Sequence, residues 1–223
     1  MIIELKKRII TSILLFILLI LMSIYTYVLI ASLIIIGIIA WIEFYALISK
    51  IYKKRSLNHI ALRFILKAIS LLYLSYLVFI IILSKLNLPD FYILILYIIL
   101  ISVMTDIGGL VVGKIFKGKR LTKISPNKTI SGSFGSFVFS LFLIPFFVKF
   151  LSSYANISVF DIFLTTLTIS LISQLGDLFI SLIKRKANVK NTSDLLPGHG
   201  GILDRIDGII FAIPLGILLF NQF

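Results

Sequence analysis

Apolar residues run along this chain in long blocks separated by short polar segments, rather than alternating with polar residues. A helix that spans a bilayer needs about 20 predominantly apolar residues, and most of these blocks approach or exceed that length. The pattern therefore predicts an all-α polytopic bundle of about seven transmembrane helices. The predicted spans are residues 9–22, 24–48, 64–84, 92–115, 133–151, 160–183 and 203–221.

Composition agrees with a membrane protein. Hydrophobic residues make up 60% of the 223 positions and charged residues only 14%, whereas a soluble domain carries about 25% charged residues. The chain has no cysteine, which excludes disulfides and thiolate-bound metals. No repeat or linker divides it. We expect one membrane domain over 1–223, with N-terminal spans in 1–100 and the candidates for a site in 101–223.

The positions of the basic residues predict the orientation of the helices. Cytoplasmic loops of membrane proteins are enriched in Lys and Arg. With the N-terminus in the cytoplasm, every Lys and Arg except Lys85 and Lys149 falls on the inside. This arrangement accounts for the net charge of +13 without a nucleic-acid partner. The basic, apolar start lacks an A-x-A cleavage site, so we expect it to remain as a first helix.

Carboxylates at membrane depth are costly and are therefore functional candidates by default. Of the nine acidic residues, those in or at the edge of predicted spans are Glu43, Asp106, Asp177, Asp204 and Asp207. For the isolated Glu43, a structural hydrogen bond explains its presence as well as a functional role does.

Three of these acids are expected to act together. Asp204 and Asp207 are three residues apart and would share one face of a helix, while Asp177 precedes Ser181 and Lys184 at helical spacing. Three converging carboxylates repel one another unless a divalent cation binds them. Carboxylate oxygens suit Mg²⁺, and zinc is disfavoured because His59 and His199 are the only histidines.

Groups suited to phosphate surround these acids in the sequence. Basic side chains can donate to phosphate oxygens, and glycines let backbone N–H groups approach an anion closely. The cations are Lys184, Arg185, Lys190, His199 and Arg205, and the glycines are Gly198, Gly200 and Gly201. This combination is typical of phosphoryl or nucleotidyl transfer, with a nucleotide polyphosphate as one substrate and a lipid as the acceptor.

A second glycine-rich segment has a different interpretation. GGLVVGKI (108–115) nearly matches a phosphate-binding P-loop, but Ile115 replaces the required Ser or Thr and an apolar helix replaces the preceding strand. Gly109 and Gly113 instead form a G-x-x-x-G pair, which predicts a close helix-packing face.

The stretch 181–207, SLIKRKANVKNTSDLLPGHGGILDRID, resembles the signature of the phosphatidate cytidylyltransferase (CDP-diglyceride synthase) family. That pattern runs S-x-x-K-R, K-D, P-x-H-G-G and D-R-x-D, and here Asn191 replaces its usual aspartate. The segment TDIGGLVVGKIFKGKRLTKISPNKT is similar to a second family region, and SQLGDLFIS resembles the stretch with its metal-binding aspartate. Through them the resemblance places Asp106, Lys119, Ser125, Pro126, Lys128, Thr129 and Asp177.

The resemblance implies a reaction of CTP with phosphatidate that gives CDP-diacylglycerol and pyrophosphate, at the cytoplasmic face of the cell inner membrane. It implies a metal site of Asp177, Asp204 and Asp207 for Mg²⁺, and leaves room for a second cation and for a homodimer. Lys184, His199 and Arg205 would join these acids as catalytic residues. The residues expected to bind substrate are Ser125, Lys128, Thr129, Ser181, Arg185, Lys190, Gly200 and Gly201.

Two alternatives remain open on the sequence. A related CTP-dependent lipid enzyme, such as a CDP-archaeol synthase or a polyprenol kinase, shares parts of the metal and phosphate layout. An ion or phosphate transporter could use intramembrane acids as a pathway, although transporter sites tend to lie near the bilayer midplane. The predicted position of these acids beside a cytoplasmic loop favours a soluble nucleotide.

Overall fold

The computed structural model describes residues 2–53, 56–122, 124–155, 157–198 and 200–222. Within these ranges the regular structure is helical, and the only β-type pairings are two isolated bridges, Arg120 with Thr129 and Leu196 with Gly200. The all-α prediction is confirmed. The helices are α1 (Ile2–Ile24), α2 (Thr26–Ile51), α3 (Leu57–Asn87), α4 (Pro89–Phe116), α5 (Ile130–Leu141), α6 (Ile144–Ala155), α7 (Val159–Lys186), α8 (Leu203–Ile206) and α9 (Ile209–Phe220).

Several of these helices have the length and composition to cross a membrane. Among the described residues they are α2, α3, α4 and α7, with the bent pair α5–α6 as a fifth candidate if it counts as one span. The four long helices coincide with the predicted spans 24–48, 64–84, 92–115 and 160–183. The membrane class is thus supported, while the count of seven and the orientation of the N-terminus stay predictions.

The predicted span 133–151 is not one straight helix. α5 ends at Leu141, α6 begins at Ile144, and the two are bent by 57°. Pro145 lies in the first turn of α6 and has no backbone N–H with which to continue α5. The N–H groups of Phe142 and Leu143 instead bond to carbonyls three residues back. The proline therefore explains why α5 and α6 are two helices and not the single predicted span.

The predicted span 203–221 is also interrupted. α8 ends at Ile206, Asp207 and Gly208 form a turn, and α9 begins at Ile209. A Cβ added at Gly208 would lie 3.2 Å from the backbone oxygen of Ser173 on α7. This close approach requires glycine at the turn. Asp207 therefore lies outside α8, and Asp204 and Asp207 do not belong to one helix as expected.

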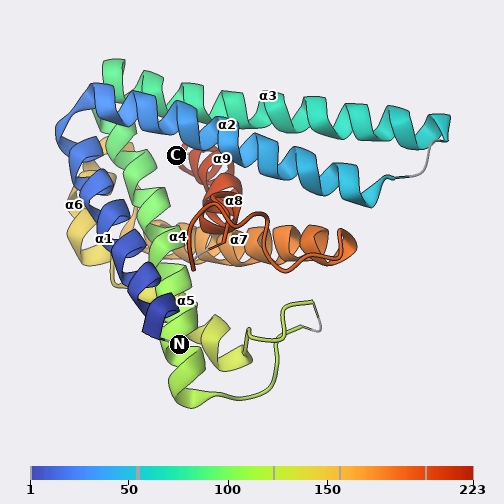
Figure 1. Ribbon diagram of the computed structural model, residues 1–223. Coiled ribbons are helices and arrows are strands. Elements are labelled where there is room, and N and C mark those ends of the chain that lie inside the picture. The colour runs from blue at the N-terminus through green and yellow to red at the C-terminus, as the bar shows by residue number, and fades with distance from the viewer. Residues whose placement is uncertain (1, 54–55, 123, 156, 199, 223) are drawn as a thin grey trace. The chain divides into compact units, whose positions relative to one another are not determined.

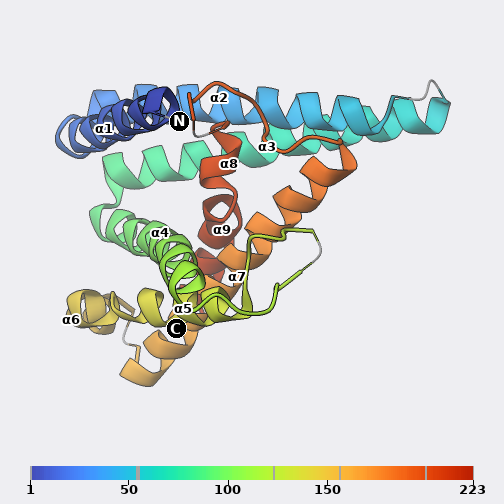
Figure 2. The same cartoon turned by 60° about the horizontal axis from the view of Figure 1, so that its bottom comes forward.

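The chain forms two compact units, each made of two stretches of sequence. The first unit contains Met1–Lys85 and Ile183–Ile206, and the second contains Leu86–Leu182 and Asp207–Phe223. In the first unit, α2 packs against α1 and α8. Trp41 Nε1 donates to the Lys67 carbonyl oxygen at 3.2 Å, which links α2 to α3 (Figures 1 and 2).

Glycines bring α4 and α5 close together in the second unit, where the two helices lie side by side (Figures 1 and 2). A Cβ at Gly132 would lie 2.7 Å from the Gly109 carbonyl oxygen and 3.4 Å from the Gly113 Cα. The predicted packing role of Gly109 and Gly113 is confirmed. α9 packs against the same α4, where a Cβ at Gly216 would meet the side chain of Ile98 at 2.7 Å.

Candidate functional site

The segment 181–207 begins in the last turns of α7, which ends at Lys186, and a tight backbone motif determines its direction beyond the helix. Asn188 has φ 55°, the Asn188 N–H donates to the Arg185 carbonyl, and the Val189 N–H donates to the Lys184 carbonyl. This pair of bonds is a Schellman motif, in which asparagine is one of the few residues that accept the left-handed position. Arg185 Nη1 adds a bond of 3.2 Å to the Val189 carbonyl oxygen. The chain therefore leaves the helix at a defined angle.

Glycines shape the following turn. Leu196 and Gly200 exchange two backbone hydrogen bonds of 2.9 and 3.1 Å, and Gly198 and Gly200 have φ of 78° and 83°. His199, a predicted catalytic residue, lies outside the described residues. A Cβ added at Gly201 would meet the carboxylate oxygens of Glu43 at 2.5 and 2.6 Å. Gly201 therefore leaves room for the Glu43 carboxylate, and Gly200 adopts a positive φ that favours glycine. The predicted contact of both glycines with substrate stays a prediction.

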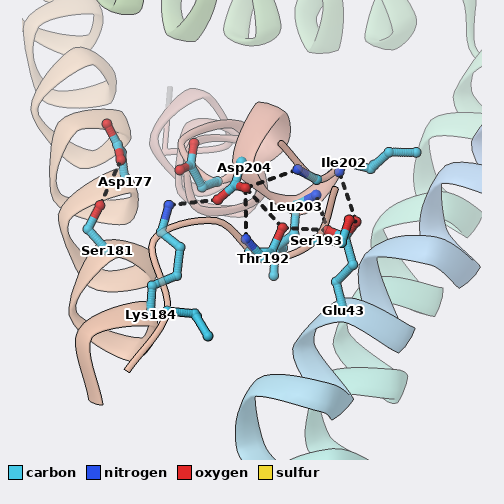
Figure 3. A network of polar contacts seen from close by, with 12 residues as sticks. Glu43, Asp177, Ser181, Lys184, Thr192, Ser193, Ile202, Leu203 and Asp204 are labelled. Carbon is cyan, nitrogen blue, oxygen red and sulfur yellow. Dashed lines mark hydrogen bonds and ion pairs between the residues drawn. The ribbon is translucent and has the colours of Figure 1, made fainter. Parts of the chain in front are cut away.

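Asp204 is held by donors on both of its carboxylate oxygens. Oδ2 accepts from the Thr192 N–H at 2.9 Å, the Thr192 hydroxyl at 3.0 Å and the Gly201 N–H at 3.1 Å. Oδ1 accepts from Lys184 Nζ at 2.6 Å in an ion pair whose side chains are 9% and 10% exposed. The loop thus folds around this carboxylate (Figure 3).

The electrostatic balance at Asp204 follows from these contacts. Asp204 lies in α8, outside the helices long enough to span a membrane. Burial alone would raise its pKa, but the hydrogen bonds from Lys184, Thr192 and Gly201 and the Lys184 charge outweigh burial, so the pKa lies below its ordinary value. The carboxylate is therefore ionised at neutral pH.

Glu43 on α2 is the residue of this region that the sequence did not assign. Its side chain is buried and accepts from the hydroxyls of Thr192 and Ser193 and from the backbone N–H groups of Ile202 and Leu203 (Figure 3). The sequence indicated its importance only by placing an isolated acid in an apolar span. Its partners are 149 to 160 residues away in the sequence, so the sequence could not identify them.

Asp177 belongs to the second unit and is less enclosed. It accepts a long hydrogen bond of 3.4 Å from the Ser181 hydroxyl, one turn further along α7. Lys128 Nζ forms an ion pair with its other oxygen, and the two side chains are 27% and 21% exposed. The structure therefore brings together a residue predicted to bind substrate and a residue predicted to bind metal.

Asp207 is also in the second unit and is 5% exposed. Its Oδ1 accepts from the Gly208 N–H at 3.0 Å. A Cβ at Gly176 would lie 2.9 Å from the Asp207 carbonyl oxygen, so the backbone of Asp207 approaches α7 one residue before Asp177. Two of the three predicted metal ligands therefore come from adjoining parts of the second unit.

The other predicted residues of the second unit lie on the hairpin that leads into α5. Backbone bonds join Leu121 to Lys128 and Ile130 to Lys119, and the Lys128 N–H donates to the Ser125 carbonyl. Thr129 caps α5, since its hydroxyl accepts from the Gly132 N–H at 3.1 Å. Thr129 thus has a structural role as a helix cap, in addition to its predicted role in substrate binding.

Exposed side chains among the other residues singled out from the sequence are those of Asp106, Arg185, Lys190 and Arg205, while Ser181 is buried.

The donor chemistry of the predicted metal ligands fits a hard cation, because all three are carboxylates. Asp177 and Asp204 each already pair with a lysine ammonium. Across the described part of the chain, no three Asp, Glu or His side chains lie close enough together to hold a metal ion. Since Asp204 belongs to the first unit and Asp177 and Asp207 to the second, convergence of the three stays a prediction.

Comparison with known proteins places these residues in a family context. The family model for cytidylyltransferases matches residues 6–223. The chain is similar to the phosphatidate cytidylyltransferase of Staphylococcus haemolyticus, with 41% identity over 129 residues, which is 57% of this chain and 49% of that protein. It is 43% identical to the Staphylococcus aureus protein of that name over 129 residues, and 42% identical to the Staphylococcus epidermidis one over 130, with the same coverage. The matched region spans about half the length of these relatives.

Proposed function

The chain belongs to the cytidylyltransferase family, and from that premise we propose that it transfers the cytidylyl group of CTP to phosphatidate. The products are CDP-diacylglycerol and pyrophosphate. The observation that carries the proposal is the folding of 184–204 around one ionised carboxylate paired with Lys184, in a chain whose relatives are named for this reaction.

The residues of the chain suit the chemical difficulty of this reaction. A phosphatidate oxygen attacks the α-phosphorus of CTP, the bond from that phosphorus to the β-phosphate bridging oxygen breaks, and pyrophosphate leaves. The nucleophile is already an anion, so it needs no general base. The barrier arises because two anions must approach each other, and positively charged donors lower it. Lys184, Arg185, Lys190 and Arg205 would supply that charge, together with His199.

Magnesium is the proposed cofactor. Asp177, Asp204 and Asp207 would hold it, and when bound it would neutralise phosphate charge. Lys128 and Lys184 pair with two of these acids, and their ammonium groups could also donate to phosphate oxygens. Ser125, Lys128, Thr129 and Ser181, with the backbone of Gly200 and Gly201, would position the CTP or the lipid headgroup.

The proposed location is a multi-pass one in the cell inner membrane, with seven spans, a cytoplasmic N-terminus and a cytoplasmic site. The apolar helices α2, α3, α4 and α7 support a membrane location. Because the chain has no cysteine, a single cysteine at Lys190 can be tested with a membrane-impermeant thiol reagent. Labelling in inverted vesicles but not in intact cells is expected, and the reverse would place this loop outside.

Labelled CTP tests the reaction and separates it from the alternatives. With purified protein, phosphatidate in detergent micelles and Mg²⁺, phosphorus-32 at the α-position of CTP should appear in lipid, and label at the γ-position should appear in pyrophosphate. Transfer of the γ-label to lipid would indicate a kinase instead. Incorporation with an archaeal ether lipid but not with phosphatidate would indicate a CDP-archaeol synthase. Ion movement in proteoliposomes without CTP consumption would favour a transporter.

A further inference from the structure

Glu43 is a buried acid that the proposed chemistry does not use. It lies in α2, a helix long and apolar enough to span a membrane, and is 4% exposed. Such a carboxylate is expensive unless it is well hydrogen-bonded. The arrangement of its donors indicates its role.

All of the described donors to Glu43 come from one segment. Oε1 accepts from the Ser193 hydroxyl at 2.5 Å and the Ile202 N–H at 3.1 Å. Oε2 accepts from the Thr192 hydroxyl and the Leu203 N–H, each at 2.8 Å. Both carboxylate oxygens of Glu43 are thus engaged by the segment 192–203.

Thr192 connects Glu43 to Asp204. Its hydroxyl oxygen lies 2.8 Å from Glu43 Oε2 and 3.0 Å from Asp204 Oδ2, and its backbone N–H donates to Asp204 at 2.9 Å. A hydroxyl has a single hydrogen, so Thr192 donates it to one carboxylate at a time or shares it between the two, and its oxygen lies within hydrogen-bond distance of both. A shift of Glu43 would therefore be transmitted to Asp204 through Thr192.

Gly201 shows how closely these groups approach. Its N–H donates to Asp204 at 3.1 Å, and a Cβ in its place would run into the Glu43 carboxylate. The backbone of the 192–203 segment thus bonds to both acids, to Glu43 through Ile202 and Leu203 and to Asp204 through Thr192 and Gly201 (Figure 3).

We infer that Glu43 is a positioning residue, which sets the orientation of Asp204 by holding the 192–203 segment. Its consequence for catalysis depends on the proposed function, whereas its effect on the segment does not. A residue that only stabilised the fold would change the amount of folded protein. A residue that orients a metal ligand would change the response of the folded protein to metal, typically 10- to 100-fold.

The test is Glu43→Gln, which preserves the shape but replaces one oxygen by an NH₂ group that faces donors instead of accepting from them. We expect the Mg²⁺ concentration for half-maximal cytidylyl transfer to rise roughly 10- to 100-fold, with excess Mg²⁺ restoring part of the rate. Amide hydrogen exchange in the peptide that contains Ile202 and Leu203 should accelerate. Asp90→Asn, a carboxamide substitution at an exposed position in the first turn of α4, is the matched control and should change neither quantity.

Ser193→Ala is the milder second variant in case Glu43→Gln does not fold. It removes one of the four donors and should shift both quantities in the same direction by a smaller factor. In the variant that folds, an unchanged Mg²⁺ response or unchanged exchange at 202–203 would overturn the inference. If wild-type protein transfers no cytidylyl group, the proposed function fails. In that case amide hydrogen exchange and the affinity for Mn²⁺, measured by electron paramagnetic resonance, test the role of Glu43. An Mn²⁺ affinity that is the same in Glu43→Gln as in the wild type would overturn the positioning role.

Discussion

Two Lys–Asp pairs, one in each unit, have the same chemistry in different surroundings. In the first unit, Lys184 and Asp204 are 10% and 9% exposed, and further N–H and O–H groups bond to the carboxylate. In the second unit, Lys128 and Asp177 are 27% and 21% exposed, and the described bond beside the ion pair is a long one from Ser181. The first carboxylate is held in one orientation and the second is held loosely.

This difference in burial and hydrogen bonding indicates separate roles for Asp204 and Asp177, which the sequence analysis grouped as metal ligands. A carboxylate with several fixed donors is preorganised, which favours placing charge at a defined point. A partly exposed ion pair contributes little stability, so loss of its partner costs little. Asp204 is thus suited to fix the geometry of the loop, and Asp177 to exchange an ammonium for a cation or a phosphate-bound metal.

The largest effect is expected from Asp204→Asn. The substitution removes the charge that Lys184 pairs with and one acceptor of the loop donors, so cytidylyl transfer should fall to background while membrane insertion is retained. Asp207→Asn should also abolish turnover. The measurement is label transfer from α-labelled CTP, with the amount of inserted protein determined in parallel. An active Asp207→Asn protein would remove Asp207 from the proposed ligands.

The next largest effect is expected on the stability of the fold, and it distinguishes the two Lys–Asp ion pairs. Lys184→Met leaves Asp204 buried without its cation, and loss of one partner of a buried pair costs about 3 to 5 kcal/mol. A decrease of several degrees in the melting temperature in detergent is expected. A melting temperature equal to that of the wild type would mean that water reaches Asp204 and that the pair is not preorganised.

An intermediate effect is expected from Gly201→Ala. The added methyl group would overlap Thr192 and the Glu43 carboxylate, and overpacking of this kind typically costs about 1 to 3 kcal/mol. Thermal unfolding and amide exchange over 192–204 would report it. Gly37→Ala, where the nearest atom is the end of a Val78 side chain, is the control and should be milder.

A smaller effect on stability is expected from Lys128→Met. The pair with Asp177 is partly exposed, so its loss should cost about 1 kcal/mol or less. Activity should nevertheless fall, because the proposed substrate contact is lost. A stability loss as large as that of Lys184→Met would contradict the distinction between the pairs.

The smallest effect is expected from Asn191→Asp, which restores the residue of the family signature. Cytidylyl transfer should be retained or improved. Asn191 packs beside Gly200, where an added Cβ would lie 3.4 Å from the Asn191 Cγ, and aspartate has nearly the same shape. A large loss of transfer would mean that the local geometry tolerates no additional charge beside Asp204.

Prediction from the sequence succeeded where one local property dominates. The long apolar runs became α2, α3, α4 and α7 because a continuous run of apolar residues specifies a helix in a bilayer whatever its neighbours. It failed at Pro145 and at Asp207–Gly208, where the helices are interrupted. Both places carry a residue known to interrupt helices, but an apolar run of sufficient length outweighed that signal in the prediction.

The same distinction applies to the site. The sequence motif in 181–207 identified Asp204, Lys184 and the glycines as candidates, because charged residues beside an apolar helix are costly and rarely lack a function. Their pairing could not be predicted: Lys184 with Asp204, and Lys128 with Asp177, are choices among many cations of similar chemistry. Glu43 was recognised only as an isolated acid, since its donors come from the other end of the chain.

The sequence by itself determined the helical membrane class, most of the helix positions and the residue types gathered near the C-terminus, because these depend on local composition and spacing. Only the tertiary structure decided which donor meets which carboxylate and how deeply each pair is buried. Hydrogen bonds and ion pairs act over about 3 Å, and contacts at that range between distant segments depend on how the whole chain folds.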